Sequence, residues 1–392
     1  MPSSRLPLAL LTVIGAVPAA AQVRTWTPAV DTVGTALRVT SPGYTAWRDT
    51  TTGWILRLEQ EIDLAGSEPW SPRAQRRTLL LPDGGVAVST VEPAKVEIYD
   101  RDGRFVRLIG RAGGGTGEYL MPSALAITGD TLVVNDARQG RVLLYSLSGR
   151  FLNSFFTDIR GTDPSMALDP RGLLRLGEAA GAAGEGKRWV YFTLRGERRD
   201  SLERPPLEPA PAWDLEIGPR MRSRFVIPFS PMPREAFLPD GSLVYGRGDR
   251  WQFLVTRSGD DTLRIMELAN TRVDSVPPAY ADTLVRDLVA SQPLLAGVAT
   301  REAIPRIFPA WNDVAVDGRG FLWVSVGYFF RRTHYFAVFH PDGRYLGYVP
   351  SWFERFEGTS WREDRVAVPA VGRDRQSIVR IYRIDRRGEG SP

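Results

Sequence analysis

Short apolar runs recur along the whole chain, and each follows a turn rich in Asp, Gly or Pro. Such residues tolerate the backbone angles of tight turns. The turns are Pro82–Gly85, Gly129–Asp130, Pro170–Gly172, Pro239–Gly241, Asp317–Gly320 and, in weaker form, Arg362–Asp364. The runs that follow, such as Val86–Val88 and Leu132–Val134, are wholly apolar or alternate with period two. This pattern is typical of β-strands buried between neighbouring sheets.

A second set of turns gives the length of the repeat. These turns are Asp102–Arg104, Ser148–Arg150 and Asp342–Arg344, with degenerate members at Gly196–Glu197 and Gly259–Asp261. The step from Asp102 to Ser148 is 46 residues. A repeat of this length, made of strands and tight turns, indicates a propeller blade. The two sets give six units, so we predict an all-β fold, a six-bladed β-propeller of four-stranded antiparallel blades.

The sixth unit has no outer strand of its own. After Ser377–Ile384 the chain ends in the polar residues 387–392, whereas the early strand Trp54–Leu58 has no blade. Pairing this strand beside the sixth unit closes the ring and removes an exposed sheet edge. We therefore expect the propeller to span residues 53–386, after an N-terminal segment at residues 22–52.

Two insertions interrupt the rhythm, at about residues 204–233 and 270–305. The second contains Ala279–Gln292, which predicts a short amphipathic helix between blades 4 and 5, ended by Pro293. Tyr280, Leu284, Leu288 and Val289 share its apolar face. Two roles stay open for the insertions: a lid or partner surface, or packing over the outer blade edges.

Residues 1–21 form a predicted signal peptide. Arg5 is followed by the apolar stretch Leu6–Val17 and by the small residues Ala19–Ala21, so we expect cleavage near Ala21. The chain has no Cys, which excludes a lipoprotein anchor, disulfides and thiolate chemistry. We therefore expect a periplasmic or extracellular protein.

The charge pattern bears on the partners. The net charge is +5, but the basic residues are scattered among 45 acidic ones rather than clustered. Nucleic-acid binders concentrate their basic residues on one face, so we expect no nucleic-acid partner. After the signal peptide, no apolar stretch is long enough to span a bilayer, and we expect a monomer without a membrane span.

One stretch resembles a known repeat. The segment Gly113–Pro122, with a Gly-Glu-aromatic-x-x-Pro pattern, precedes the apolar strand Leu132–Asp136, and Arg141 follows. This arrangement resembles the NHL repeat, in which Asp136 and Arg141 match the usual aspartate and arginine. Residues 304–323 are similar to a segment of bacterial exported six-bladed β-propeller proteins. NHL-like propellers include scaffolds, peptide and polysaccharide binders, an amidating lyase and calcium-dependent lactonase relatives, so the resemblance implies the fold far more than an activity.

Most of the conspicuous residues suggest blade geometry rather than catalysis. The glycine run Gly110–Gly117 lacks the Gly-Lys-Ser/Thr ending of a phosphate loop, so we interpret it as a connection between blades in which Tyr119 packs as an anchor. The only two histidines, His334 and His340, are too few for a catalytic zinc site. We expect both to lie outside the channel, and no Gly-x-Ser-x-Gly elbow is present.

Calcium needs only oxygen ligands, and lactonase-type propellers place such ligands at the starts of the inner strands. The candidates here are Asp163, Glu235, Asn312 and Asp313. Inner-strand entrances are polar in most propellers, which is the alternative explanation of these residues. A calcium-dependent hydrolase, lactonase or lyase is therefore our alternative hypothesis, and calcium is its only cofactor.

Aromatic and arginine residues near the insertions favour binding. The candidates are Trp213, Arg222, Arg224, Trp251, Trp311, Arg331 and Arg332. Such a set suits a peptide, glycan or protein ligand, although ordinary blade packing also accounts for aromatic residues. We predict an exported, non-catalytic binding scaffold of the NHL-like type, without a cofactor, whose ligand binds at the channel mouth and the insertion face.

Overall fold

The computed structural model describes residues 27–42, 52–64, 75–157, 159, 166–178, 188–218, 221–269, 271, 273–327, 334–353 and 355–386. The predicted signal peptide, its cleavage site and the polar tail at residues 387–392 lie outside these ranges. None of the helices in the described ranges is long and apolar enough to cross a membrane.

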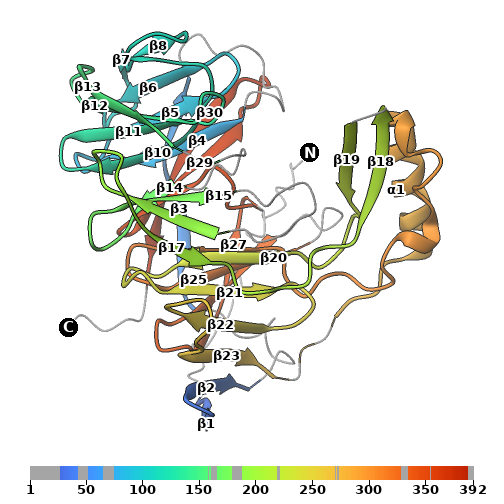
Figure 1. The fold of residues 1–392 in the computed structure, drawn as a ribbon. Coiled ribbons are helices and arrows are strands. Elements are labelled where there is room, and N and C mark those ends of the chain that lie inside the picture. The colour runs from blue at the N-terminus through green and yellow to red at the C-terminus, as the bar shows by residue number, and fades with distance from the viewer. Residues whose placement is uncertain are drawn as a thin grey trace, which may run out of the picture.

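Six β-sheets stand around a central axis and form a six-bladed β-propeller (Figure 1). Within each blade the strands pair antiparallel with their neighbours in the chain. Blades 1 to 3 are β4 (Arg76–Leu80), β5 (Val86–Thr90), β6 (Lys95–Tyr99) and β7 (Phe105–Leu108); β10 (Pro122–Thr128), β11 (Thr131–Asp136), β12 (Arg141–Ser146) and β13 (Phe151–Phe156); and β14 (Met166–Leu168), β15 (Leu174–Glu178), β16 (Arg188–Phe192) and β17 (Arg198–Glu203). Blades 4 to 6 are β20 (Pro233–Phe237), β21 (Leu243–Arg247), β22 (Gln252–Thr256) and β23 (Arg264–Leu268); β24 (Asp313–Val316), β25 (Leu322–Val326), β26 (His334–Phe339) and β27 (Tyr345–Ser351); and β28 (Ser360–Arg362), β29 (Arg365–Val371) and β30 (Ser377–Asp385), completed by β3 (Ile55–Asp63). The predicted fold is confirmed.

The ring closes as the sequence predicted. Strand β3 pairs antiparallel with β30 and supplies the outer strand of blade 6. Leu56 and Ile62 of β3 are buried in the two clusters that blade 6 shares with blades 5 and 1. An early strand of the chain and the last strand, β30, are therefore held in the same blade.

Both sets of predicted turns lie between consecutive strands of a blade. Gly103 shows why glycine is needed at one of them. Its φ is +79°, a conformation that L side chains rarely adopt, and a Cβ there would lie 2.6 Å from the Gln60 amide nitrogen. The apolar inner residues, including Val86, Val133 and Trp323, are fully buried between blades.

Phe105 is an exception among the aromatic residues of the blades. Aromatic residues that follow the outer turns of a propeller are expected to fill the interfaces between its sheets, but the Phe105 side chain is 47% exposed. Phe105 starts an outer strand, where the neighbouring blade no longer covers the sheet, and it only contacts Tyr99 edge-on.

The glycine run forms the connection between blades 1 and 2, as predicted. Two short strands, β8 (Arg111–Ala112) and β9 (Glu118–Tyr119), pair in parallel across it. The buried Tyr119 hydroxyl donates to the Ile109 carbonyl at 2.7 Å and accepts from the Val96 amide at 2.9 Å. Tyr119 therefore anchors the connection to blade 1.

A further hairpin was not predicted. Strands β1 (Ala29–Val33) and β2 (Ala36–Ser41) form it, and β2 pairs parallel with β23. Blade 4 thereby becomes a six-stranded sheet with β1 at its edge. Val39 is buried against this sheet, and Ser41 accepts a hydrogen bond from the Tyr345 amide of blade 5.

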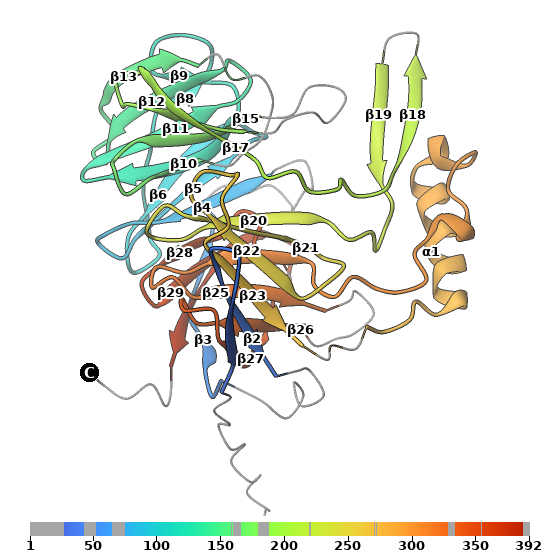
Figure 2. The same cartoon turned by 60° about the horizontal axis from the view of Figure 1, so that its bottom comes forward.

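The two insertions pack against each other and form an insertion lobe outside the ring (Figures 1 and 2). Its elements are the hairpin of β18 (Ala212–Gly218) and β19 (Met221–Val226), the helix α1 (Pro278–Ser291), and the 3-10 turns η2 (Pro293–Leu295) and η3 (Arg301–Ala303). The predicted helix is thus present, with Pro278 at its first turn, where the missing N–H costs nothing. Tyr280, Leu284, Leu288 and Val289 pack into the lobe's own core, as their spacing indicated.

Candidate functional site

Two adjoining cavities occupy the mouth of the axial channel, with volumes of about 900 Å³ and 850 Å³. Together they are lined by residues of, or next to, the inner strands of all six blades. Six residues line both: Arg77, Arg204, Val226, Met232, Arg234 and Glu357. We call the two together the channel mouth, and its size suits a small ligand or a short chain segment.

The insertion lobe forms one wall of the channel mouth. Ile227, Phe229, Tyr280 and Leu284 line the second cavity from the lobe side. Phe229 is held there by an edge-on contact with Phe308, at 4.8 Å between ring centroids. Packing over the outer blade edges was one of the two roles left open for the insertions. Because the lobe also lines the channel mouth, this role alone does not describe it.

Arginine–carboxylate pairs surround the channel mouth. Arg204, which follows blade 3, pairs with Glu235 at the start of blade 4. The Arg234 Nε lies 3.3 Å from an Asp313 carboxylate oxygen. Arg77 and Glu357 form the third pair, at 3.2 Å. Each pair joins neighbouring blades or the segments beside them, so the pairs also fix the positions of the inner strands.

Asp313 is a largely buried carboxylate, with 20% of its side chain exposed. Burial raises its pKa, although the nearby Arg234 and hydrogen bonds from the Phe356 and Val314 amides oppose this shift. The Asn312 side chain donates to the Gly327 carbonyl at 2.6 Å, and the backbone carbonyl of Asn312 accepts from the Arg234 Nε at 3.2 Å. The polar groups at this inner-strand entrance are thus engaged with protein partners.

These contacts bear on the four candidate calcium ligands. Asp163 lies outside the described residues. Glu235 and Asp313 are each paired with a different arginine, and the two line different cavities. In the described ranges, no three His, Asp or Glu residues are grouped so that they could hold a metal ion. The described candidates therefore do not form a calcium cage.

The predicted binding residues are dispersed. Trp213 is buried in the core of the insertion lobe, while Trp251 and Trp311 are buried between blades 4 and 5. Arg224 is exposed on β19 and lines the first cavity. Arg222 pairs with Glu216 in the backbone register of the hairpin, and its side chain is not described. Arg331 and Arg332 lie outside the described residues.

The histidines separate, contrary to expectation. We expected both to lie outside the channel, but His334 at the start of β26 lines the second cavity. His340 lies in the outer turn of blade 5, where its Nδ1 accepts from the Asp342 amide at 3.2 Å.

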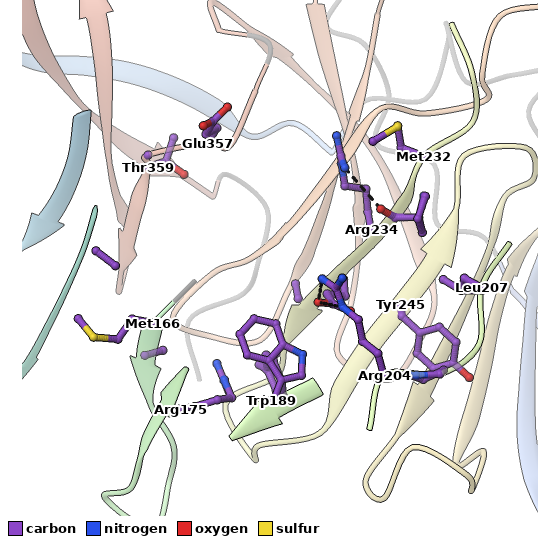
Figure 3. A pocket seen from close by; sticks show the side chains of 18 of the residues that line it. Met166, Arg175, Trp189, Arg204, Leu207, Met232, Arg234, Tyr245, Glu357 and Thr359 are labelled. Carbon is purple, nitrogen blue, oxygen red and sulfur yellow. Dashed lines mark hydrogen bonds and ion pairs between the residues drawn. The ribbon is translucent and has the colours of Figure 1, made fainter. Parts of the chain in front are cut away.

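Sequence reasoning missed one wall of the first cavity. It is made by Arg175 of β15 and Trp189 of β16 (Figure 3), together with Phe237 of β20. The Arg175 guanidinium carbon lies 3.2 Å from the centroid of the Phe237 ring and 5.6 Å from that of Trp189. Burial lowers the pKa of Arg175 to about 10, despite the opposing effect of Tyr191. One signal was available, because Arg175 interrupts the apolar run Leu173–Leu176.

The chain was compared with sequence families, curated proteins and solved structures, and the family comparison agrees with the architecture. A sequence family described as a 6-bladed β-propeller matches residues 87–170. No curated protein sequence matches the chain. Among solved structures, one similar to this chain is named as an exported protein of Bacteroides fragilis, at 12% identity, with 89% of this chain and 99% of that chain covered and a TM-score of 0.48. A virginiamycin B lyase from Staphylococcus aureus is 10% identical, over 84% and 99% of the two chains, with a TM-score of 0.44. The calcium-binding protein regucalcin from Agrobacterium tumefaciens is 12% identical, over 79% and 90%, with a TM-score of 0.39.

Proposed function

We propose that this protein is an exported, non-catalytic binding scaffold that holds a peptide, glycan or protein ligand in the channel mouth, against the insertion lobe. The observation that carries the proposal is the pair of adjoining cavities, lined both by inner strands and by the lobe. Export is inferred from the predicted signal peptide. In this proposal the propeller is a rigid frame for the ligand. The insertion lobe, which interrupts the 46-residue repeat, supplies the part of the site that is particular to this protein.

The chemistry of the channel mouth favours binding over catalysis. The carboxylates Glu235, Asp313 and Glu357 are each held by an arginine. A carboxylate engaged in this way is a poorer metal ligand than a free one, because the arginine competes with a metal ion for the carboxylate oxygens. This supports a scaffold rather than the calcium-dependent hydrolase, lactonase or lyase of the alternative hypothesis.

A substitution that fills part of the channel mouth with a larger side chain tests the proposal. Val226 is 43% exposed and lines both cavities, so Val226→Trp adds bulk to the channel mouth without disturbing the core. Val106→Trp, at 41% exposure on the outer strand β7, is the matched control. The mature protein and both variants are applied to peptide and glycan arrays, and hits are measured by calorimetry.

We expect a ligand that the protein and Val106→Trp bind alike and that Val226→Trp binds about tenfold more weakly or not at all. Ligands that bind all three proteins equally would place binding elsewhere and contradict the proposal. A rise in Tm with millimolar calcium would favour the metal-dependent alternative, because a ligand of the native state stabilises it.

A further inference from the structure

Two buried N–H donors on one wall of the first cavity have no acceptor within the described protein. They are the Nε of Arg175 and the indole Nε1 of Trp189. Both residues line the cavity, and they are only 8% and 5% exposed. Buried donors are nearly always hydrogen-bonded in folded proteins, so an acceptor that enters this cavity would satisfy both.

The two donors are held in place by their neighbours. Arg175 and Trp189 point from adjacent strands of blade 3 toward the same wall, and Arg204 lies beside the indole (Figure 3). The guanidinium of Arg175 stacks on Phe237, while the Trp189 ring packs edge-on against the same ring, at 5.1 Å between centroids. Phe237 thus fixes both side chains beside the cavity.

The charge of Arg175 lacks a partner of opposite sign. Its side chain is hydrogen-bonded to Tyr191, but within the described ranges no carboxylate lies at ion-pair distance from it. The nearest acidic groups are engaged elsewhere, since Asp169 pairs with Arg171 and Glu235 pairs with Arg204. A buried cation of this kind is stabilised by an anion that comes from outside the chain.

Arg175 differs in this from the other arginines that line the first cavity. Each of those is matched by a carboxylate: Arg77 by Glu357, Arg204 by Glu235, Arg224 by Asp214 and Arg234 by Asp313. The faces of the large aromatic rings are already covered by packing, which disfavours stacking with a sugar ring as the main contact. What the wall offers a ligand is therefore positive charge and N–H donors.

We infer that Arg175 and Trp189 form a seat for an oxyanion group of the ligand, a carboxylate or a phosphate, which accepts hydrogen bonds from Arg175 Nε and Trp189 Nε1. The inference rests on the proposed function and adds the chemical class of the ligand. The geometry assigns the anion to the wall between blades 3 and 4, and it leaves the remainder of the channel mouth for the rest of the ligand.

Two small anions test the seat. Inorganic phosphate and succinate are titrated into the mature protein at constant ionic strength made up with chloride, which separates specific binding from screening. Tm and calorimetry are the measurements. We expect Tm to rise with at least one of the two anions relative to chloride. If only phosphate raises Tm, the anionic group of the ligand is a phosphate. If only succinate raises it, the group is a carboxylate.

Three variants assign the effect to the seat. Trp189→Phe keeps an aromatic side chain but removes the N–H donor together with part of the indole ring system, so we expect the anion to bind about tenfold more weakly. Arg175→Met should abolish binding, and circular dichroism checks that it folds. Arg195→Gln, on the exposed outer turn of the same blade, should bind like the unaltered protein.

The seat is refuted if neither anion raises Tm above the chloride control, or if Trp189→Phe binds as tightly as the unaltered protein. The array experiment separates this failure from a failure of the proposed function. A neutral ligand that Val226→Trp loses and Trp189→Phe keeps would leave the scaffold standing and remove the oxyanion seat.

Discussion

At the scale of single residues, the repeat signature acts on the backbone. Asp136 accepts hydrogen bonds from the Leu120 amide at 2.8 Å and from the Met121 amide at 3.1 Å. Arg141 donates to the carbonyls of Gly115 and Glu118. Both residues therefore hold the connection between blades 1 and 2, and their conservation in a repeat would need no ligand to explain it.

Glu118, in the same connection, predicts a pH dependence. Its pKa is lowered by a hydrogen bond from the Gly115 amide and by Arg111. A carboxyl whose pKa is lower in the folded state contributes stability above its unfolded-state pKa, about 4.3, and loses it as the pH falls through the lowered folded-state pKa. Glu118→Gln keeps an oxygen acceptor and removes the charge.

We therefore expect the Tm of Glu118→Gln to lie slightly below that of the unaltered protein at pH 7 and to fall less steeply between pH 5 and 3. Thermal unfolding monitored by circular dichroism across this range measures both. Parallel curves would show that the Glu118 charge does not stabilise the connection.

The functional residues were harder to predict than the turns. Trp251 and Trp311 lie near an insertion in the sequence, but both are buried at the interface of blades 4 and 5, just before the strands β22 and β24. Arg175 lies in a strand whose apolar residues are structural, yet it lines the channel mouth. Which side of a buried strand meets the channel depends on blade order and tilt, and one sequence does not fix these.

At the scale of elements, strand β3 closes the propeller ring by pairing with β30. Leu56 and Leu58 are two residues apart on this strand, yet Leu56 is 4% exposed and Leu58 is 49% exposed. A register shift between Leu58 and Gln60 separates the buried ends of the strand. The pair therefore offers the same substitution in two environments on one element.

We expect Leu56→Ala to lower the free energy of unfolding by about 2–5 kcal/mol, because it leaves a cavity between blades 5 and 6. Leu58→Ala should change it by about 0.5 kcal/mol. Urea unfolding monitored by fluorescence measures both. Equal effects of the two substitutions would contradict the packing of β3 in the ring.

The elements were predictable to different degrees for a physical reason. Turn residues and the spacing of apolar residues act locally. The turns, helix α1 and the closing strand β3 could therefore be predicted from the sequence. The hairpin β1–β2 was not, because its partner β23 lies more than 200 residues away and no local pattern records a parallel pairing. The joining of the two insertions into one lobe is likewise a long-range contact.

At the scale of the whole molecule, two deletions distinguish the contribution of the β1–β2 hairpin to folding from that of ring closure by β3. Removing residues 27–51 takes away β1 and β2 but keeps β3, so we expect a folded propeller of lower Tm. Removing residues 27–64 also takes away β3, which opens blade 6 and leaves β30 as an unpaired edge.

We expect the longer deletion to aggregate or to elute as larger species in size-exclusion chromatography, while the shorter deletion elutes as a compact protein. Circular dichroism melts should be cooperative only for the shorter deletion. A longer deletion that folds cooperatively and elutes like the shorter one would show that closure by β3 is dispensable.

The pairing of β3 with β30 also imposes a delay on folding, because β3 is synthesised long before its partner. The two strands are more than 300 residues apart, and a ribosome adds about 5–20 residues per second. The strand made first therefore waits tens of seconds for its partner, with its apolar side chains uncovered. During synthesis, blades 1 to 5 can form in order, but the ring locks only when the last strand has been made.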